Sequence, residues 1–289
     1  MTADSSWIKK VVVVGAGQMG SGIAQVFAQA GYEVILSDIT EELANKGKER
    51  ISKGLDRIVK KGKITEEQKN EILSRIHPTV DLENNAKDAD LLIEAIIEKM
   101  EAKKDLFKKV DKILPERAIL ASNTSSLSIT EMASVTSRPE KFLGAHFFNP
   151  PPVMKLIEFI KGYQTSQETL DIMLDLGKRL GKTPVVAVEA PGFIVNRLLM
   201  PFLNEAYFAL QEGIASVEEI DTAVKLGLNH PMGPFELSDF IGLDTILYIA
   251  EYLFNEFGED KYRPCPLLRK MVRAGKLGRK TGEGFYKYN

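Results

Sequence analysis

Three glycines near the start of the chain have the spacing of a dinucleotide-binding turn. Gly15, Gly17 and Gly20 follow the apolar run of residues 11–14 and open a stretch, 21–30, whose apolar residues recur at helical spacing. In such a unit the first glycine permits a tight turn, the second lets the backbone approach a pyrophosphate, and the third allows the helix to pack closely on the strand. The pyrophosphate would lie at the helix N-terminus, where unpaired N–H groups and the helix dipole favour an anion.

An acidic residue completes this βαβ unit. A second predicted strand, 32–36, leads to Asp38, at the position where a carboxylate accepts hydrogen bonds from the adenosine ribose. A carboxylate there repels the 2′-phosphate of NADP, and Ile39 and Thr40 offer no arginine to receive it. The unit therefore predicts an NAD site. The competing interpretations are an ordinary glycine-rich turn and an Asp38 that only forms the turn before the next helix.

Histidine is the natural proton acceptor for a dehydrogenase that oxidises an alcohol, because its proton exchanges near neutral pH. The chain has three histidines. His77 and His230 each precede a proline, and we interpret both as loop residues. His146 ends an apolar strand predicted over 142–148, where it is either the catalytic base or a core histidine bonded to the backbone.

Positive charge gathers on a long helix predicted over 41–63. This segment has eight basic and four acidic residues, a net charge of +4 in a chain whose formal net charge is −2. Six of the basic residues form a stripe beside the apolar one: Lys46, Arg50, Lys53, Arg57, Lys60 and Lys61. Such a stripe is either a solvated helix face or a binding site for an anionic ligand.

The elements that would position these residues alternate between apolar strands and helices. Further strand candidates lie at 90–95, 118–121 and 142–148, with a helical stretch at 99–114 between the first two. This alternation predicts an α/β fold with a doubly wound sheet of Rossmann type. Ligands bind such sheets beyond the carboxyl ends of the strands. Three polar segments fall there: 98–103, 122–126 and 146–152.

Length and composition predict two domains. The 289 residues reach the size, roughly 250 to 300 residues, at which a single core stops growing. The composition changes after the last strand candidate, 182–188, and Pro191 and Gly192 mark a boundary. We expect an NAD-binding domain over 1–189 and an all-helical C-terminal domain over 190–289. Helical patterns in the latter lie at 193–211, 216–225, 243–257 and 266–274.

Charge and cysteine content restrict the partners and the compartment. The near-balance of 38 basic and 40 acidic residues gives no general attraction to nucleic acid or to an anionic membrane. No apolar run approaches the roughly 18 residues that a membrane span needs. The single cysteine, Cys265, cannot form an intramolecular disulfide. We expect a cytoplasmic protein without a metal site, a nucleic-acid partner or a membrane partner.

Five motifs, taken in order, resemble those of the short-chain L-3-hydroxyacyl-CoA dehydrogenase family, in particular its bacterial 3-hydroxybutyryl-CoA dehydrogenase type. They are GAGQMG at 15–20, SNTSSL at 122–127, GAHFFNPP at 144–151, PGFIVNR at 191–197 and GEGFY at 282–286. Many dehydrogenases share the first, whereas the other four in this order are specific, and the resemblance spans nearly the whole chain. It implies an oxidoreductase that interconverts (S)-3-hydroxybutyryl-CoA and acetoacetyl-CoA with NAD.

The resemblance also implies roles for individual residues. His146 would be the general base and acid, and Glu158 would orient its imidazole and stabilise the imidazolium. Ser125 would bind the substrate oxygen, Asn196 would add a polar contact from the second domain, and Lys61 would contact coenzyme A. The implied cofactor contacts are Gly15, Gly17, Gln18, Met19, Gly20, Asp38, Glu98, Lys103, Asn123 and Asn149.

Without the resemblance, three of these residues have structural interpretations. Glu158 is an exposed strand carboxylate, Ser125 caps a helix that begins near Leu127, and Asn196 is a polar residue early in a helix. Two alternative functions also remain: a dehydrogenase of a free 3-hydroxy acid or sugar acid, and a non-catalytic NAD-binding protein. The basic stripe argues against the first, and the presence of both His146 and Glu158 argues against the second.

The predicted helix 193–211 has more large apolar residues than one buried stripe of a small domain needs. A surplus apolar face indicates a subunit interface, and the resemblance implies dimerisation through the second domain. We therefore expect a homodimer; the alternative is a central helix surrounded by its own domain. Pro201 lies inside this helix and should kink it or interrupt its hydrogen bonding.

Overall fold

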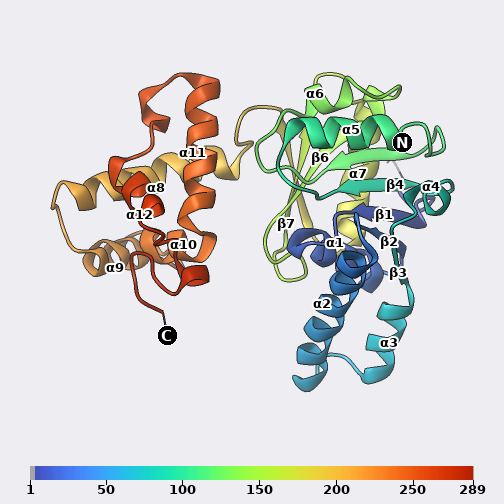
Figure 1. Cartoon of the computed structure of the whole chain (residues 1–289), viewed down its shortest axis with the longest axis horizontal. Helices are drawn as coiled ribbons and strands as arrows, with labels where there is room; N and C mark the ends of the chain where they lie inside the picture. Colours follow the sequence, from blue (N-terminus) through green and yellow to red (C-terminus); the bar gives the residue numbers. More distant parts are fainter. Residues whose placement is uncertain (1–3, 289) are drawn as a thin grey trace. The chain divides into compact units, whose positions relative to one another are not determined.

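The chain folds into an α/β unit followed by a helical unit, as the sequence predicts (Figure 1). The computed structural model describes residues 4–288 and divides after Ala190 into these two compact units. The border falls one residue from the expected one. Within the described residues, no helix is both long and apolar enough to cross a membrane.

An eight-stranded sheet forms the centre of the N-terminal unit, in the order β3-β2-β1-β4-β5-β6-β7-β8. All neighbouring strands are parallel except β6 and β7, which are antiparallel. The order reverses between β1 and β4, which is the switch point where such sheets bind ligands. The strands are β1 (Lys10–Val14), β2 (Glu33–Ser37), β3 (Ile76–Thr79), β4 (Leu91–Glu94), β5 (Ile119–Ser122), β6 (Phe142–Phe147), β7 (Leu156–Lys161) and β8 (Thr183–Val188).

Helices cover both faces of the sheet, which is why its central strands are almost wholly apolar. Val11 and Val13 share one buried cluster with residues of α1 (Gln18–Gln29), α2 (Glu41–Lys60), α3 (Glu66–Ser74) and α7 (Gln167–Arg179). On the opposite face Phe107 of α5 (Met100–Val110) packs on Phe142, with 4.6 Å between the ring centroids. Two short helices, α4 (Leu82–Asn85) and α6 (Ile129–Ala133), complete the unit.

Several elements differ from those predicted. His77 and Pro78, interpreted as loop residues, lie in β3, and the prediction is wrong there. A proline is tolerated because β3 is an edge strand that pairs only with β2. His77 Nε2 lies 2.8 Å from the carboxylate of Glu33 on that neighbouring strand. The helices α3 and α7 are not among the predicted elements, and α2 ends three residues early because Gly62 has a φ of +66°.

The C-terminal unit contains five α-helices in the part that the structure describes. Ser216 and Glu219 form a capping box at the start of the second one. The first helix continues through Pro201 to its end. The helices are α8 (Val195–Gln211), α9 (Val217–Gly227), α10 (Pro234–Ile241), α11 (Leu243–Phe257) and α12 (Pro266–Arg273).

The last of the five sequence motifs, 282–286, is held by a buried acid. Asp239 accepts hydrogen bonds from Phe285 N and Tyr286 N, both at 2.9 Å. A Cβ built on Gly284 would lie 2.0 Å from Asp239 Oδ1, so only glycine permits this approach. The motif therefore secures the end of the chain against α10.

Candidate active site

The three glycines at the junction of β1 and α1, the last of them in the first turn of α1, have different surroundings. Gly15 has a φ of +100°, and a Cβ built on it would lie 2.4 Å from Ala95 O. A Cβ on Gly20 would lie 1.7 Å from Gly15 O, so a larger residue would push α1 away. A Cβ on Gly17 would meet no atom within 4 Å. That open space is where the motif places a pyrophosphate, so the loop fits the predicted dinucleotide.

The N-terminus of α1 presents donors to the same space. Gly17 is the N-cap residue, it has no side chain that could cap the helix, and the first turn contains no acidic residue. The N–H groups of this turn and the positive end of the helix dipole therefore favour an anion. Gln18 and Met19 belong to the turn, and Gln18 Nε2 donates to Asn149 Oδ1 at 3.0 Å. This hydrogen bond links Gln18 and Asn149, two of the implied cofactor contacts.

Asp38, just after β2, shapes the glycine loop. Its Oδ2 accepts a hydrogen bond from Ala16 N and its Oδ1 accepts one from Ile39 N, both at 2.7 Å. A carboxylate offers about four acceptor positions, so Asp38 retains the capacity to bind ribose hydroxyls. On the other side of the loop, Arg50 Nη1 of α2 donates to Ala16 O at 2.9 Å.

The strands β6 and β7 pair His146 directly with Glu158. His146 Nδ1 and Glu158 Oε2 are 2.7 Å apart, and the two side chains are 6% and 0% exposed. An ionised carboxylate only accepts hydrogen bonds, so it selects the tautomer that carries the proton on Nδ1. His146 Nε2 is then the nitrogen that can take a proton. The interpretation of Glu158 as an exposed carboxylate, which the residues alone favoured, is wrong.

The polar segments predicted at the carboxyl ends of the strands are bonded to one another. Asn123 Oδ1, after β5, accepts a hydrogen bond from Phe147 N at the end of β6, at 2.9 Å. Glu98 Oε1, after β4, accepts one from Ser125 N at 3.0 Å. Ser125 is not a helix cap, because α6 is capped by Ser128. Hydrogen bonds therefore link the segments that follow β4, β5 and β6 at this edge of the sheet.

A buried ion pair between β4 and α5 was not predicted. Lys103 Nζ lies 2.5 Å from Glu94 Oε1 and 3.1 Å from Glu98 Oε2, and the Lys103 and Glu94 side chains are 1% and 0% exposed. Glu94 also accepts hydrogen bonds from Ser122 Oγ at 2.6 Å and Ile96 N at 2.7 Å. Burial raises the pKa of Glu94, while Lys103 acts in the opposite direction. In the sequence, the feature that could have indicated this ion pair is Glu94, an acidic residue at the end of an otherwise apolar strand.

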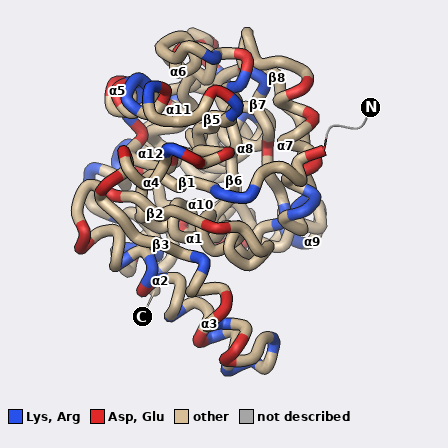
Figure 2. The backbone as a smooth tube through the Cα atoms, turned by 90° about the vertical axis from the view of Figure 1, so that its right-hand side faces the viewer, with Lys and Arg blue, Asp and Glu red and all other residues tan. Residues whose placement is uncertain are grey.

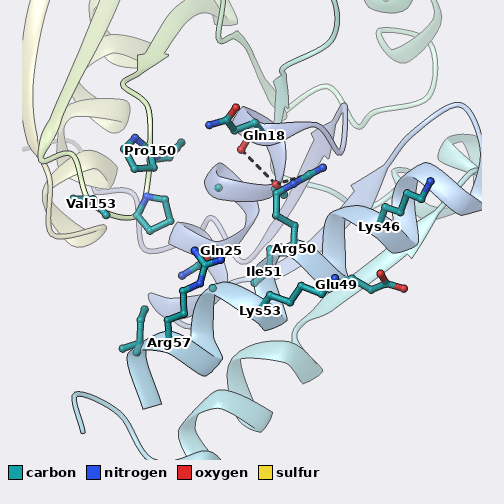
Figure 3. A pocket seen from close by; sticks show the side chains of 16 residues that line it. Gln18, Gln25, Lys46, Glu49, Arg50, Ile51, Lys53, Arg57, Pro150 and Val153 are labelled. Atoms are coloured by element: carbon teal, nitrogen blue, oxygen red, sulfur yellow. Dashed lines mark hydrogen bonds between the residues drawn. The ribbon is translucent and has the colours of Figure 1, made fainter. Parts of the chain in front are cut away.

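A pocket of about 710 Å³ lies between α1, α2 and the loop 150–153. Figure 3 shows Arg50, Lys53 and Arg57 along its α2 side, with Pro150 and Val153 across from them. The α2 wall contributes one acid, Glu49, and four of the six predicted stripe cations: Lys46, Arg50, Lys53 and Arg57. Lys61, the implied coenzyme A contact, follows the end of α2 and does not line the pocket.

Asn196 belongs to the C-terminal unit, where it is the second residue of α8 and is 8% exposed. Its contact with a substrate stays a prediction. Among residues 4–288, no group of three or more His, Cys, Asp or Glu side chains could hold a metal ion.

Comparison with known proteins gives matches along nearly the whole chain. Residues 10–190 match the family model of the 3-hydroxyacyl-CoA dehydrogenase NAD binding domain, and residues 192–288 match that of the 3-hydroxyacyl-CoA dehydrogenase C-terminal domain. The probable 3-hydroxybutyryl-CoA dehydrogenase of Deinococcus radiodurans is 54% identical over 279 residues, which cover 96% of this chain and 100% of that protein.

A human protein and a solved bacterial structure are similar as well. The mitochondrial hydroxyacyl-coenzyme A dehydrogenase of Homo sapiens is 48% identical, with 97% of this chain and 91% of that protein covered. The crystal structure of (S)-3-hydroxybutyryl-CoA dehydrogenase from Ralstonia eutropha has a TM-score of 0.92 and 49% identity, with 98% of this chain and 99% of that chain covered.

Proposed function

Because this chain belongs to the 3-hydroxyacyl-CoA dehydrogenase family, we propose that it interconverts (S)-3-hydroxybutyryl-CoA and acetoacetyl-CoA. NAD, when bound, supplies the acceptor and donor of the hydride at carbon 3 of the substrate. The observation that carries the proposal is the buried His146–Glu158 pair, which lies in the same unit as a glycine loop fitted to a dinucleotide.

In this function His146 moves the proton. Its Nε2 removes the 3-hydroxyl proton during oxidation and returns it to the carbonyl oxygen during reduction. Glu158 accepts the hydrogen bond from Nδ1, keeps the ring in one orientation and stabilises the positive charge that the ring gains. Ser125 binds the reacting oxygen, and its backbone is held by Glu98. Asn196 supplies a further polar contact from α8.

The proposed cofactor contacts lie on the glycine loop and on the segments after β2, β4, β5 and β6. Asp38 binds the adenosine ribose, and this carboxylate favours NAD over NADP because it repels a 2′-phosphate. Lys103 holds Glu98 in place through their 3.1 Å ion pair. The full set is Gly15, Gly17, Gln18, Met19, Gly20, Asp38, Glu98, Lys103, Asn123 and Asn149.

The phosphates of coenzyme A fit the basic pocket beside α2. Four cations against one acid line that wall, and guanidinium and ammonium groups bind phosphate oxygens by charge-assisted hydrogen bonds. Lys61 extends the same basic helix and is a further proposed contact.

Turnover of acetoacetyl-CoA and of free acetoacetate, each with NADH, tests this assignment. We expect kcat/KM to be at least roughly 100-fold higher for acetoacetyl-CoA, because the free acid lacks two or more phosphate contacts of about 1.5–3 kcal/mol each. Equal values for the two substrates would contradict the coenzyme A assignment. The same assay with NADPH tests the role of Asp38. We expect a lower kcat/KM with NADPH than with NADH, because the carboxylate repels the 2′-phosphate.

We also propose that the chain forms a homodimer through its C-terminal unit. Large apolar side chains on α8, α9 and adjoining turns are 58% to 81% exposed: Leu198, Ile214, Leu226 and Leu228. Light scattering should give the mass of a dimer for the wild type and of a monomer for the double variant Leu198→Glu/Leu226→Glu, because the added charges cannot be buried. Val80→Glu, at a 45% exposed site of the N-terminal unit, is the control and should stay dimeric. A dimeric double variant would refute this interface.

A cytoplasmic location and the lack of nucleic-acid and membrane partners are proposed on composition. The only cysteine, Cys265, is buried, as suits a reducing compartment. Basic and acidic residues are interspersed along the described chain, without a large region of one sign (Figure 2).

A further inference from the structure

We propose that Arg50 couples the binding of the acyl-CoA to the binding of the dinucleotide. Its guanidinium group bonds to the glycine loop and also lines the basic pocket. The proposal rests on the function proposed above, because it takes the pocket occupant to be the phosphates of coenzyme A.

The contacts of Arg50 with the glycine loop involve two consecutive carbonyl groups. Arg50 Nη1 donates to Ala16 O at 2.9 Å and to Ser21 Oγ at 3.2 Å. Ser21 Oγ in turn donates to Gly17 O at 2.6 Å. Figure 3 shows Arg50 on the side of the pocket that adjoins Gln18. Arg50 therefore fixes Ala16 O directly and, through one hydroxyl group, adds to the helical bond from Ser21 N that holds Gly17 O at 3.0 Å.

Fixing these carbonyls also fixes the donors of the cofactor site. In a trans peptide the C=O and the following N–H point in opposite directions. Ala16 O shares its peptide with Gly17 N, and Gly17 O shares its peptide with Gln18 N. By holding Ala16 O on the α2 side, Arg50 turns the N–H group of Gly17 to the other side of the loop, and the two bonds from Ser21 to Gly17 O do the same for the N–H group of Gln18. These N–H groups lie at the N-terminus of α1, which is the predicted pyrophosphate position.

The pocket side of Arg50 uses different nitrogens. Both hydrogen bonds that it makes within the described residues start from Nη1. A guanidinium group has five N–H donors, so Nε and Nη2 retain three of them for a ligand, in the fork that matches a phosphate. A phosphate bound there would fix the plane of the guanidinium without displacing Nη1 from Ala16 O.

The helix that carries Arg50 is in direct contact with the loop. A Cβ built on Gly47, one turn before Arg50, would lie 2.7 Å from Ala16 Cβ and 2.9 Å from Ala16 O. The α2 backbone therefore has little room to shift relative to the loop. A ligand that orders Arg50 consequently orders the loop as well, so the second ligand meets a site whose ordering entropy has already been lost.

Calorimetric titration with coenzyme A measures this coupling without turnover. We expect the wild type to bind coenzyme A at least about 5-fold more tightly when it is saturated with NADH, and to bind NADH more tightly by the same factor in the presence of coenzyme A. Arg50→Gln should bring both factors close to one. Arg50→Lys should also bring both factors close to one, although it keeps the positive charge in the pocket. Lysine has a single side-chain nitrogen, so it cannot bond to Ala16 O through one nitrogen and to a phosphate through another.

The matched control is Lys53→Gln. It removes one positive charge from the same helix and pocket, but Lys53 makes no contact with the glycine loop among the described hydrogen bonds. Its affinity for coenzyme A should fall while the coupling factor stays that of the wild type. Coupling that is absent from the wild type, retained in both Arg50 variants, or lost equally in Lys53→Gln would overturn the role of Arg50. A wild type that binds no coenzyme A would instead refute the proposed function itself.

Discussion

Replacing His146 by glutamine is expected to lower kcat for acetoacetyl-CoA reduction by about 10³-fold, within the 10²–10⁴ range of acid–base catalysis. Glutamine has a similar size and can still bond to Glu158, but it cannot exchange a proton. The affinity for NADH should change by less than about 2-fold, because the glycine loop and Asp38 lie on other elements of the sheet. Steady-state kinetics and fluorescence titration with NADH check the two parts. A turnover near that of the wild type would exclude His146 as the acid and base.

The variant Glu158→Gln tests the role of Glu158, the hydrogen-bond partner of His146. Removal of the carboxylate takes away the charge that stabilises the imidazolium, and we expect a loss of kcat smaller than that of His146→Gln. Because Glu158 acts through His146, the double variant should be no slower than His146→Gln alone. Losses that multiply in the double variant would show that the two residues act independently.

Replacing Lys103 by methionine is expected to lower the free energy of unfolding by about 3–5 kcal/mol. Methionine fills much of the lysine volume but leaves the buried carboxylate of Glu94 without its cation. The ion pair with Glu98 is lost as well, so the hold on Ser125 N weakens and the Kd for NADH should rise. Urea unfolding and NADH titration measure the two effects.

The pH dependence of this loss has a defined sign. Burial raises the pKa of Glu94, Lys103 opposes the rise, and its removal therefore raises this pKa further. A carboxyl group whose pKa is higher in the folded state destabilises the fold when ionised, and this cost fades as the pH falls and the group takes a proton. The stability difference between wild type and Lys103→Met should thus shrink as the pH falls through the raised pKa of Glu94. A difference independent of pH would argue against an uncompensated Glu94.

Glu94→Gln/Lys103→Met serves as the matched control. Both charges are removed together, so no buried ion is left unpaired, and the loss of stability should be smaller than in Lys103→Met. The hydroxyl group of Ser122 keeps a hydrogen-bond acceptor in the side-chain oxygen of the glutamine. A double variant that is less stable than Lys103→Met would contradict the coupling of the two charges.

The features that were readable from the sequence are those set by neighbouring residues. Gly15 and Gly20 follow from backbone φ and steric limits within a single turn, Gly17 follows from the space that a pyrophosphate needs, and their spacing from Asp38 follows from the length of one βαβ unit. The α/β class and the helical C-terminal unit follow from hydrophobic periodicity, which reflects burial of one face or of both. His146 could be singled out because it lies near the end of an apolar strand.

Tertiary structure decided which side chains of the site contact one another. Glu158 lies against His146 because β7 runs antiparallel to β6 in one register, and a shift by one residue would turn Glu158 to the opposite face. Glu94 pairs with Lys103 because the lysine side chain of α5 is buried against the end of β4, and Arg50 reaches Ala16 O because α2 packs on the glycine loop. Periodicity shows that a side chain is buried or exposed, but packing and strand register choose what it contacts. The chemistry of this site therefore depends on contacts that no local pattern specifies.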